Sequence, residues 1–182
     1  KSLTLANQGN VGDYAFEWCT GIKTAEITNN GWIGMSAFYG CDSLVSVLIS
    51  NAGDIEQQAF RRCYSLQTAM ISNKGEIGLS SFSDCTSLTS VTIGDEVDRL
   101  GTTAFSGCSL LAEITIPHSV LYAGSECFSG CNSLERATIG DGLYSISEAM
   151  FKDCSSLQEV NIGNKVTEIK TNAFSGCSKL QS

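Results

Sequence analysis

Cysteine is the residue type in this sequence with the widest chemistry, because thiols form disulfides, bind zinc and act as nucleophiles. The 182-residue chain contains nine cysteines and one histidine. A cysteine follows three residues after each of the eight phenylalanines, which are Phe16, Phe38, Phe60, Phe82, Phe105, Phe128, Phe151 and Phe174. Successive copies are 22 residues apart in the first half and 23 apart in the second. The cysteines therefore belong to an internal repeat, which has to be interpreted before any site.

The repeated thiol position is occupied by eight cysteines: Cys19, Cys41, Cys63, Cys85, Cys108, Cys131, Cys154 and Cys177. Stacked repeats place these side chains in one file at intervals of about 4.8 Å. A relaxed disulfide needs a Cβ to Cβ distance of about 3.8 Å, and zinc needs four converging ligands. The spacing predicts neither, and indicates buried free thiols that pack as small hydrophobic groups. Cys127 lies off the file, just before Phe128, and is predicted to be another buried filler.

Few other residues suggest catalysis. His118 follows Pro117 in a turn and has no second histidine with which to form a triad. The turn carboxylates Asp95, Glu96 and Asp141 lack the fixed repeat offsets of calcium-binding β-repeats. We therefore predict a protein that is not an enzyme and has no cofactor and no metal site.

The charge balance limits the class of partner. The chain has 11 basic and 19 acidic residues, a formal net charge of -8. Nucleic acids and anionic membranes need clustered Lys and Arg, so both are disfavoured. No apolar run approaches the roughly 20 residues of a spanning helix, so no membrane insertion is expected. Composition therefore disfavours these two classes of partner.

Each repeat contains two short extended segments joined by turns. The first has the pattern Leu-x-x-Val-x-Ile, as in Leu88, Val91 and Ile93, whose alternation is typical of a half-buried strand. Eight parallel strands are expected in all. The second segment centres five residues before each phenylalanine, for example at Ile77, and is too short for a helix. It is expected to form a brief strand or tight turn on the opposite face.

Turn residues divide the array into two halves. Turns of the first half contain Asn-x-Gly, where glycine is expected to allow the corner, and turns of the second half are one residue longer with an apolar end. The second residue after each phenylalanine is often Gly or Asp and should adopt a positive φ. We expect stacking to continue unbroken across Gly94. Residues 1–182 are then one leucine-rich repeat domain of about eight repeats, interpreted as a fragment of a longer array.

The repeat resembles a known family. Val97, Leu100, Gly101, Ala104-Phe105 and Cys108, followed by Leu111, Ile114 and Ile116-Pro117, match the unit of the BspA-like (Treponema pallidum type) leucine-rich repeat family. The resemblance implies a curved, β-rich solenoid with little helix and its Leu-x-x-Val-x-Ile strands on the concave face. It also implies a cell-surface or secreted protein of an anaerobe or parasite that adheres to host extracellular matrix or another microbial surface. Free thiols are compatible with that habitat.

The outward positions of successive strands form the candidate binding surface: Glu26, Leu48, Met70, Thr92, Thr115, Thr138 and Asn161. Leu48 and Met70 interrupt a polar surface on adjacent strands and are a candidate contact patch. Trp18 and Trp32 stand at positions that are polar in other repeats, so they either pack on a neighbouring repeat or anchor a ligand. Two alternative functions remain open, a structural spacer and an intracellular protein-interaction scaffold.

Overall fold

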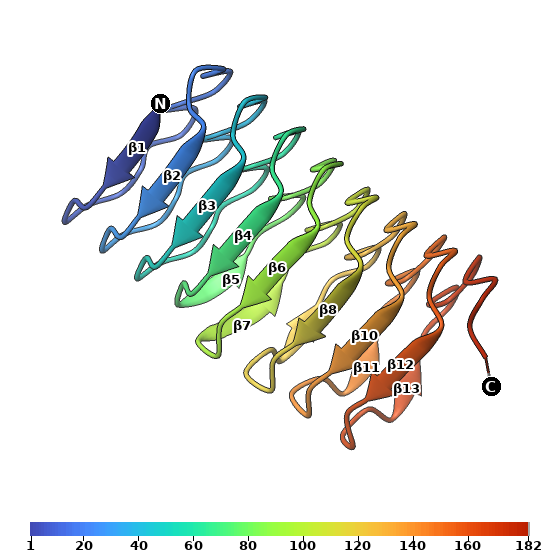
Figure 1. Ribbon diagram of the computed structural model, residues 1–182. Helices are drawn as coiled ribbons and strands as arrows, with labels where there is room; N and C mark the ends of the chain where they lie inside the picture. The colour runs from blue at the N-terminus through green and yellow to red at the C-terminus, as the bar shows by residue number, and fades with distance from the viewer. Residues whose placement is uncertain (182) are drawn as a thin grey trace.

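The first segment of every repeat forms a strand of four residues. The computed structural model describes residues 1–181, in which there is no helix and hence none that could cross a membrane. Eight long strands follow one another along the solenoid (Figure 1): β1 (Ser2–Leu5), β2 (Thr24–Ile27), β3 (Ser46–Ile49), β4 (Thr68–Ile71), β6 (Ser90–Ile93), β8 (Glu113–Ile116), β10 (Arg136–Ile139) and β12 (Glu159–Ile162). We call the turn of the solenoid that begins with each long strand a rung, numbered 1 to 8.

The second segment forms brief strands of two to four residues, as expected: β5 (Gly75–Ile77), β7 (Val97–Leu100), β9 (Tyr122–Ala123), β11 (Ser145–Ile146) and β13 (Glu168–Ile169). In the earlier rungs single parallel bridges take their place, joining Val11 to Ile33, Ile33 to Ile55 and Ile55 to Ile77. The predicted leucine-rich repeat solenoid is therefore confirmed.

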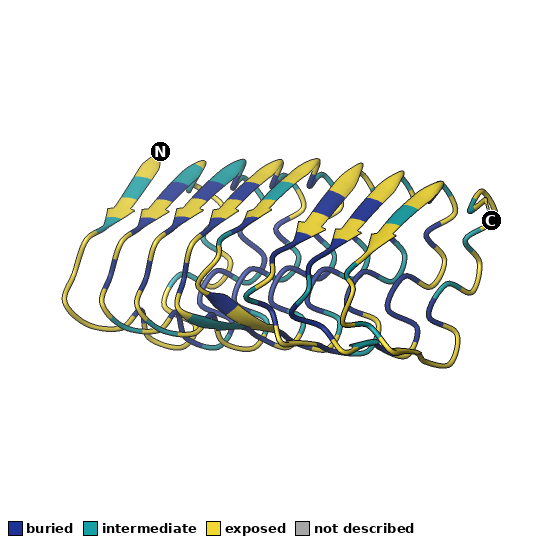
Figure 2. Ribbon diagram, turned by 90° about the horizontal axis from the view of Figure 1, so that it is seen from below, coloured by how far each residue is buried: buried dark blue, intermediate teal, exposed yellow. Residues whose placement is uncertain are grey.

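The long strands make the main sheet face, which is the predicted concave face. They pair in parallel and in register in the orders β1-β2-β3-β4-β6 and β8-β10-β12. Within residues 1–181, however, β6 is not paired with β8, and the arrows of these strands stand wider apart in Figure 2. The expectation of unbroken stacking just beyond Gly94 is wrong for the main sheet. The hydrophobic core does continue, as one cluster from Val11 to Ala173.

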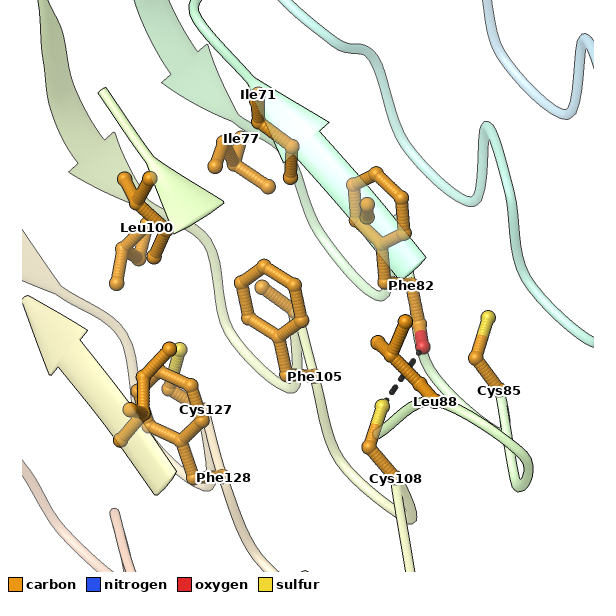
Figure 3. Close-up of a cluster of buried hydrophobic side chains, with 14 of the residues drawn as sticks. Ile71, Ile77, Phe82, Cys85, Leu88, Leu100, Phe105, Cys108, Cys127 and Phe128 are labelled. Carbon is orange, nitrogen blue, oxygen red and sulfur yellow. Dashed lines mark hydrogen bonds between the residues drawn. The ribbon is translucent and has the colours of Figure 1, made fainter. Parts of the chain in front are cut away.

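A file of phenylalanine rings runs through that core. Ring centroids of successive phenylalanines are 4.9 to 5.6 Å apart, and their planes lie within 15° of parallel. The six rings from Phe38 to Phe151 are fully buried. Figure 3 shows Phe82, Phe105 and Phe128 stacked beside Leu88 and Leu100. One rung cannot bury its own ring, so each depends on its neighbours for stability.

Two backbone positions of every repeat adopt a left-handed conformation. The second residue after each phenylalanine, from Trp18 to Gly176, has φ between 55° and 81°, which confirms the expectation. The second residue before each phenylalanine, from Tyr14 to Asn172, also has positive φ, between 52° and 59°. The sequence did not reveal this second position because none of its eight residues is glycine.

Glycines in the shorter turns have a different role from the one expected. Among Gly9, Gly31, Gly53 and Gly75, only Gly75 has a left-handed φ, of 110°. Gly53 instead lies so close to the preceding turn that a Cβ atom would come within 2.9 Å of the Trp32 nitrogen. Close approach of backbones therefore demands glycine there.

Three asparagines of these turns, in rungs 2 to 4, are buried and bind the preceding rung. Nδ2 of Asn29 donates to the Gly9 carbonyl at 2.9 Å, and Nδ2 of Asn51 donates to the Gly31 carbonyl at 3.1 Å. Asn73 donates in the same way to Gly53 at 3.5 Å. These amides satisfy carbonyl groups that the turn would otherwise leave without partners.

Candidate functional site

The seven residues predicted to face outward are all exposed on the main sheet face: Glu26, Leu48, Met70, Thr92, Thr115, Thr138 and Asn161. Strand register aligns the first four side by side and the last three side by side. Thr92 and Thr115 lie on neighbouring strands but are not register partners, because the main sheet is interrupted between them. The surface therefore consists of two aligned blocks.

Alternation along each strand produces this surface. In β3, for example, Val47 and Ile49 are buried in the core at 3% and 0% exposure, whereas Leu48 between them points outward. Successive side chains of a strand lie on opposite faces, so the inward pair determines where the third residue points. Inward residues of the neighbouring strands, such as Ala25 and Ala69, are equally buried.

Leu48 and Met70 form an apolar pair at the centre of the first block. They are register partners on β3 and β4, with 39% and 55% of their surfaces exposed. Glu26 is the next residue on one side and Thr92 on the other. Directly opposed side chains in neighbouring strands lie about 5 Å apart, so the pair presents one continuous apolar area.

The second block carries paired charges instead. Arg136 on β10 donates through Nη2 to Oε2 of Glu113 on β8 at 3.1 Å, and its Nη1 lies 3.9 Å from Oε2 of Glu135. These groups are well exposed, so the pairs contribute little stability. With Glu159 on β12, three carboxylates surround this one arginine, so Thr115, Thr138 and Asn161 lie in a polar surface with an excess of negative charge.

A cavity of about 460 Å³ lies between the two blocks. Its walls are β6 with the preceding Thr89 and most of β8 with the preceding Ala112. Thr92 and Thr115, both predicted binding residues, line its opposite sides. Sequence reasoning selected these two residues but not the cavity, because a repeat pattern predicts equal spacing at every junction.

Six of the eight thiols in the file are buried, and the two at its ends, Cys19 and Cys177, are half-buried. All nine cysteines are free. Sγ of Cys108 donates to the Phe82 carbonyl of the preceding rung at 3.3 Å (Figure 3), and Sγ of Cys85 donates to Phe60 at 3.2 Å. The same bond recurs from Cys41 to Cys177. The cysteines are therefore donors between rungs as well as the apolar fillers that the sequence suggested.

Burial also suppresses the nucleophilicity of these thiols. It raises the pKa of Cys41 to about 11 and the pKa of Cys85 and Cys127 to about 12. The thiolate is the reactive form of cysteine, and these groups are protonated at neutral pH. Their environment suits a structural role.

His118 and the turn carboxylates connect neighbouring turns. Nδ1 of His118 accepts a hydrogen bond from the Asp141 backbone N–H at 3.0 Å, and Oδ1 of Asp141 accepts one from the Asn164 N–H at 2.7 Å. Glu96 pairs with Lys74 at 3.5 Å. Residues 1–181 contain no cluster of three or more His, Cys, Asp or Glu residues that could hold a metal ion.

The two tryptophans differ in their surroundings. Trp18 is 53% exposed, but its ring lies over Gly40 and meets Tyr39 edge-on with centroids 5.2 Å apart. Trp18 therefore packs on the next rung. Trp32 is 48% exposed, and its backbone N–H donates to Oδ1 of Asn10 at 3.2 Å.

Comparison with known proteins agrees with the fold. A family model described as the BspA type leucine rich repeat region matches residues 1–89 and 54–181, in six copies. A crystal structure of a leucine-rich repeat protein from T. pallidum is similar, with a TM-score of 0.79 and 27% identity over 88% of this chain and 78% of that chain.

A Bacteroides ovatus leucine-rich repeat protein has a TM-score of 0.62 and 23% identity over 94% of this chain and 57% of that chain. No match was found among curated protein sequences. The repeat unit, the solenoid and the family model agree over nearly the whole length, and the chain belongs to the BspA-type leucine-rich repeat family.

Proposed function

We propose that this chain is a non-enzymatic, protein-binding adhesion domain of a cell-surface or secreted protein. The observation that carries the proposal is the exposed apolar pair Leu48–Met70 at the centre of an otherwise polar sheet. Its ligand is a protein, in host extracellular matrix or on another microbial surface. Family membership supports protein binding, and the surface location rests on the family resemblance stated above.

The chemistry of the pair favours a protein surface as ligand. Neighbouring exposed apolar side chains on a polar face mark contact sites, and a few such residues usually supply most of the binding energy. The net charge of -8 disfavours phosphate-rich ligands. Leu48 and Met70 stand on paired strands, so their backbones are held in place without a ligand and only side-chain freedom is lost on binding.

We also propose that residues 1–182 act as one repeat domain within a longer array. Support comes from the core cluster, which extends from Val11 to Ala173 across the interruption in the main sheet. The chain spans 57% of the length of its Bacteroides ovatus relative. Repeat arrays of this kind grow by adding rungs to a continuous core.

A spacer function is the alternative, supported by the uniform Thr92, Thr115 and Thr138. Repeated small hydroxyl groups give a sheet good β-propensity but little ligand specificity. An intracellular scaffold is a further alternative, favoured by the nine free thiols.

Surface plasmon resonance against immobilised fibronectin, laminin and collagen tests the proposal. The double variant Leu48→Glu/Met70→Glu should bind at least about tenfold more weakly than the wild type, the loss expected for removing a central contact. Leu121→Glu/Tyr144→Glu is the matched control, because both residues are 63% exposed and lie outside the main sheet. Equal affinities of the first variant and the wild type would refute the role of the pair. Absence of wild-type binding to all three proteins would favour the spacer.

A further inference from the structure

The interruption between β6 and β8 leaves two strand edges facing each other. By the register kept elsewhere in the sheet, the backbone N–H and C=O groups of Val91 and Ile93 point toward those of Glu113 and Thr115. No strand pairing joins them in residues 1–181. Unpaired edge groups are a template for an additional strand. We call this gap, lined by β6 and β8, the seam.

The backbone hydrogen bond that lies just before the paired strands at other junctions is also missing at the seam. Thr89 N–H donates to the Gln67 carbonyl at 3.0 Å, and Glu135 N–H donates to the Ala112 carbonyl at 2.8 Å. The equivalent bond from Ala112 to Thr89 is not formed in the described part of the chain. The interruption thus extends beyond the N-terminal end of both strands.

Pro117 removes the bond at the opposite end. Gly94, at the equivalent position of rung 5, donates its N–H to the Ile71 carbonyl at 2.7 Å, and Gly140 donates to the Ile116 carbonyl at 2.9 Å. Proline has no N–H and cannot make this bond. The Ile93 carbonyl at the seam therefore lacks the partner that the sheet supplies to Ile71 and Ile116.

The seam also uncovers part of the core. Val91 is only half-buried, and Ile93 is 8% exposed. The equivalent residues of the neighbouring rung, Ala69 and Ile71, are 1% and 0% exposed. A ligand bound in the 460 Å³ cavity would thus contact unpaired backbone groups and the apolar side chains of Val91 and Ile93.

The remainder of the junction between rungs 5 and 6 is intact. The rings of Phe105 and Phe128 are stacked with centroids 5.4 Å apart, and Gly107 N–H donates to the Ser129 carbonyl at 2.8 Å. Strands β7 and β9 are paired as well. The opening is therefore confined to the main sheet face, and the rest of the junction can serve as its hinge.

We propose that the seam binds an extended polypeptide segment, which pairs as an added strand with the edges of β6 and β8. Only another extended backbone has donors and acceptors at the same spacing as the unpaired groups along both strand edges. Alternate apolar side chains of that segment would cover Val91 and Ile93. An inserted strand needs its two neighbours about 9.6 Å apart, twice the usual interval, so binding widens the seam about its hinge. The inference rests on the proposed protein-binding function and names an unstructured segment as the partner.

Hydrogen exchange of the free protein is the first test. Amides that face the seam, Ile93 and Thr115, should exchange at least about tenfold faster than those of Ile71 and Thr138, which face paired strands. Protection equal to that of Ile71 and Thr138 would show that the seam is closed in solution and would overturn the proposal.

A synthetic peptide with the sequence Leu88–Asp95 is the binding probe, because that segment already pairs in parallel within this sheet. Its addition should raise the protection of Ile93 and Thr115 about tenfold and leave Ala69 unchanged. The same peptide carrying Val91→Pro lacks a central donor and should bind more weakly. Absence of added protection at millimolar peptide overturns the proposal.

Cross-linked variants distinguish this site from the apolar pair. Thr92→Cys/Thr115→Cys, bridged by a short bis-alkylating reagent, should lose peptide binding because the seam cannot widen. Met70→Cys/Thr92→Cys bridges strands that are already paired and is the matched control. Peptide binding that survives the seam bridge contradicts insertion. Leu48→Glu/Met70→Glu should retain peptide binding. A failure of the adhesion proposal can therefore be distinguished from a failure of the seam proposal.

Discussion

Alkaline pH should destabilise this solenoid through its buried thiols. Burial raises the pKa of Cys41 to about 11 and the pKa of Cys85 and Cys127 to about 12, whereas thiols of the unfolded chain titrate near pH 8.5 to 9. Between these values the unfolded state loses protons that the folded state keeps. The thiols therefore stabilise the fold fully below about pH 8.5, and this contribution falls as pH rises toward the folded pKa.

The magnitude follows from the pKa differences. At pH 10 each such thiol lowers the free energy of unfolding by about 1 to 2 kcal/mol relative to pH 7.5, which gives about 3 to 6 kcal/mol for the three together. Whole domains are stable by about 5 to 15 kcal/mol, so the loss is large. Burial also raises the pKa of Cys63, Cys108, Cys131 and Cys154. Their titration lowers the free energy of unfolding at alkaline pH in the same way.

Urea unfolding at pH 7.5 and pH 10, in the presence of a phosphine reductant and followed by circular dichroism, measures this loss. Cys85→Ala is the control, because it removes one thiol and should reduce the pH dependence by about 1 to 2 kcal/mol. An unfolding free energy that changes by less than about 1 kcal/mol in the wild type would refute the reasoning. An equal loss in both proteins would assign the effect to other groups.

Three further predictions concern packing and backbone conformation. Phe82→Ala should lower the free energy of unfolding by about 3 to 5 kcal/mol, measured by urea unfolding, because it opens a cavity in the ring file; a loss below about 1 kcal/mol would contradict this. Gly53→Ala should lower the melting temperature because its Cβ would clash with the preceding turn, whereas Gly9→Ala has open space and should leave it unchanged; equal melting temperatures would exclude the clash. Ala149→Gly should raise the unfolding free energy by about 0.5 to 1 kcal/mol by relieving a φ of 52°, and Ala104→Gly, which lacks a left-handed φ, should lower it; a loss in both variants would argue against strain at Ala149.

Local pattern was enough to predict the architecture of each rung. The alternation of Leu88, Val91 and Ile93 identified β6 and its inward face, because side-chain direction in a strand has a period of two. The same argument placed Leu48 and Met70 outward, and the structure has them exposed as register partners. Neither prediction depended on the contacts between one rung and the next.

Predictions that depended on the junctions between rungs were less complete. A repeat of 22 or 23 residues predicts the same strand pairing between every two rungs. Pro117, however, has no N–H to donate, and β6 and β8 do not pair. The repeat pattern indicates an apolar filler at Cys85, whereas its thiol also donates a hydrogen bond to the Phe60 carbonyl at 3.2 Å. The amide of Asn51 is comparable, because its carbonyl partner belongs to the preceding rung.

By itself, the sequence determined the repeat, the family, the strand positions and which residues face the core, since these follow from periodicities within one rung. Tertiary structure alone decided how each rung contacts the next: the thiol and amide hydrogen bonds, the close approach at Gly53, and the seam between Thr92 and Thr115. The physical reason is that the interval between two rungs results from every contact across that junction, and a missing donor at one end changes it without altering the repeat.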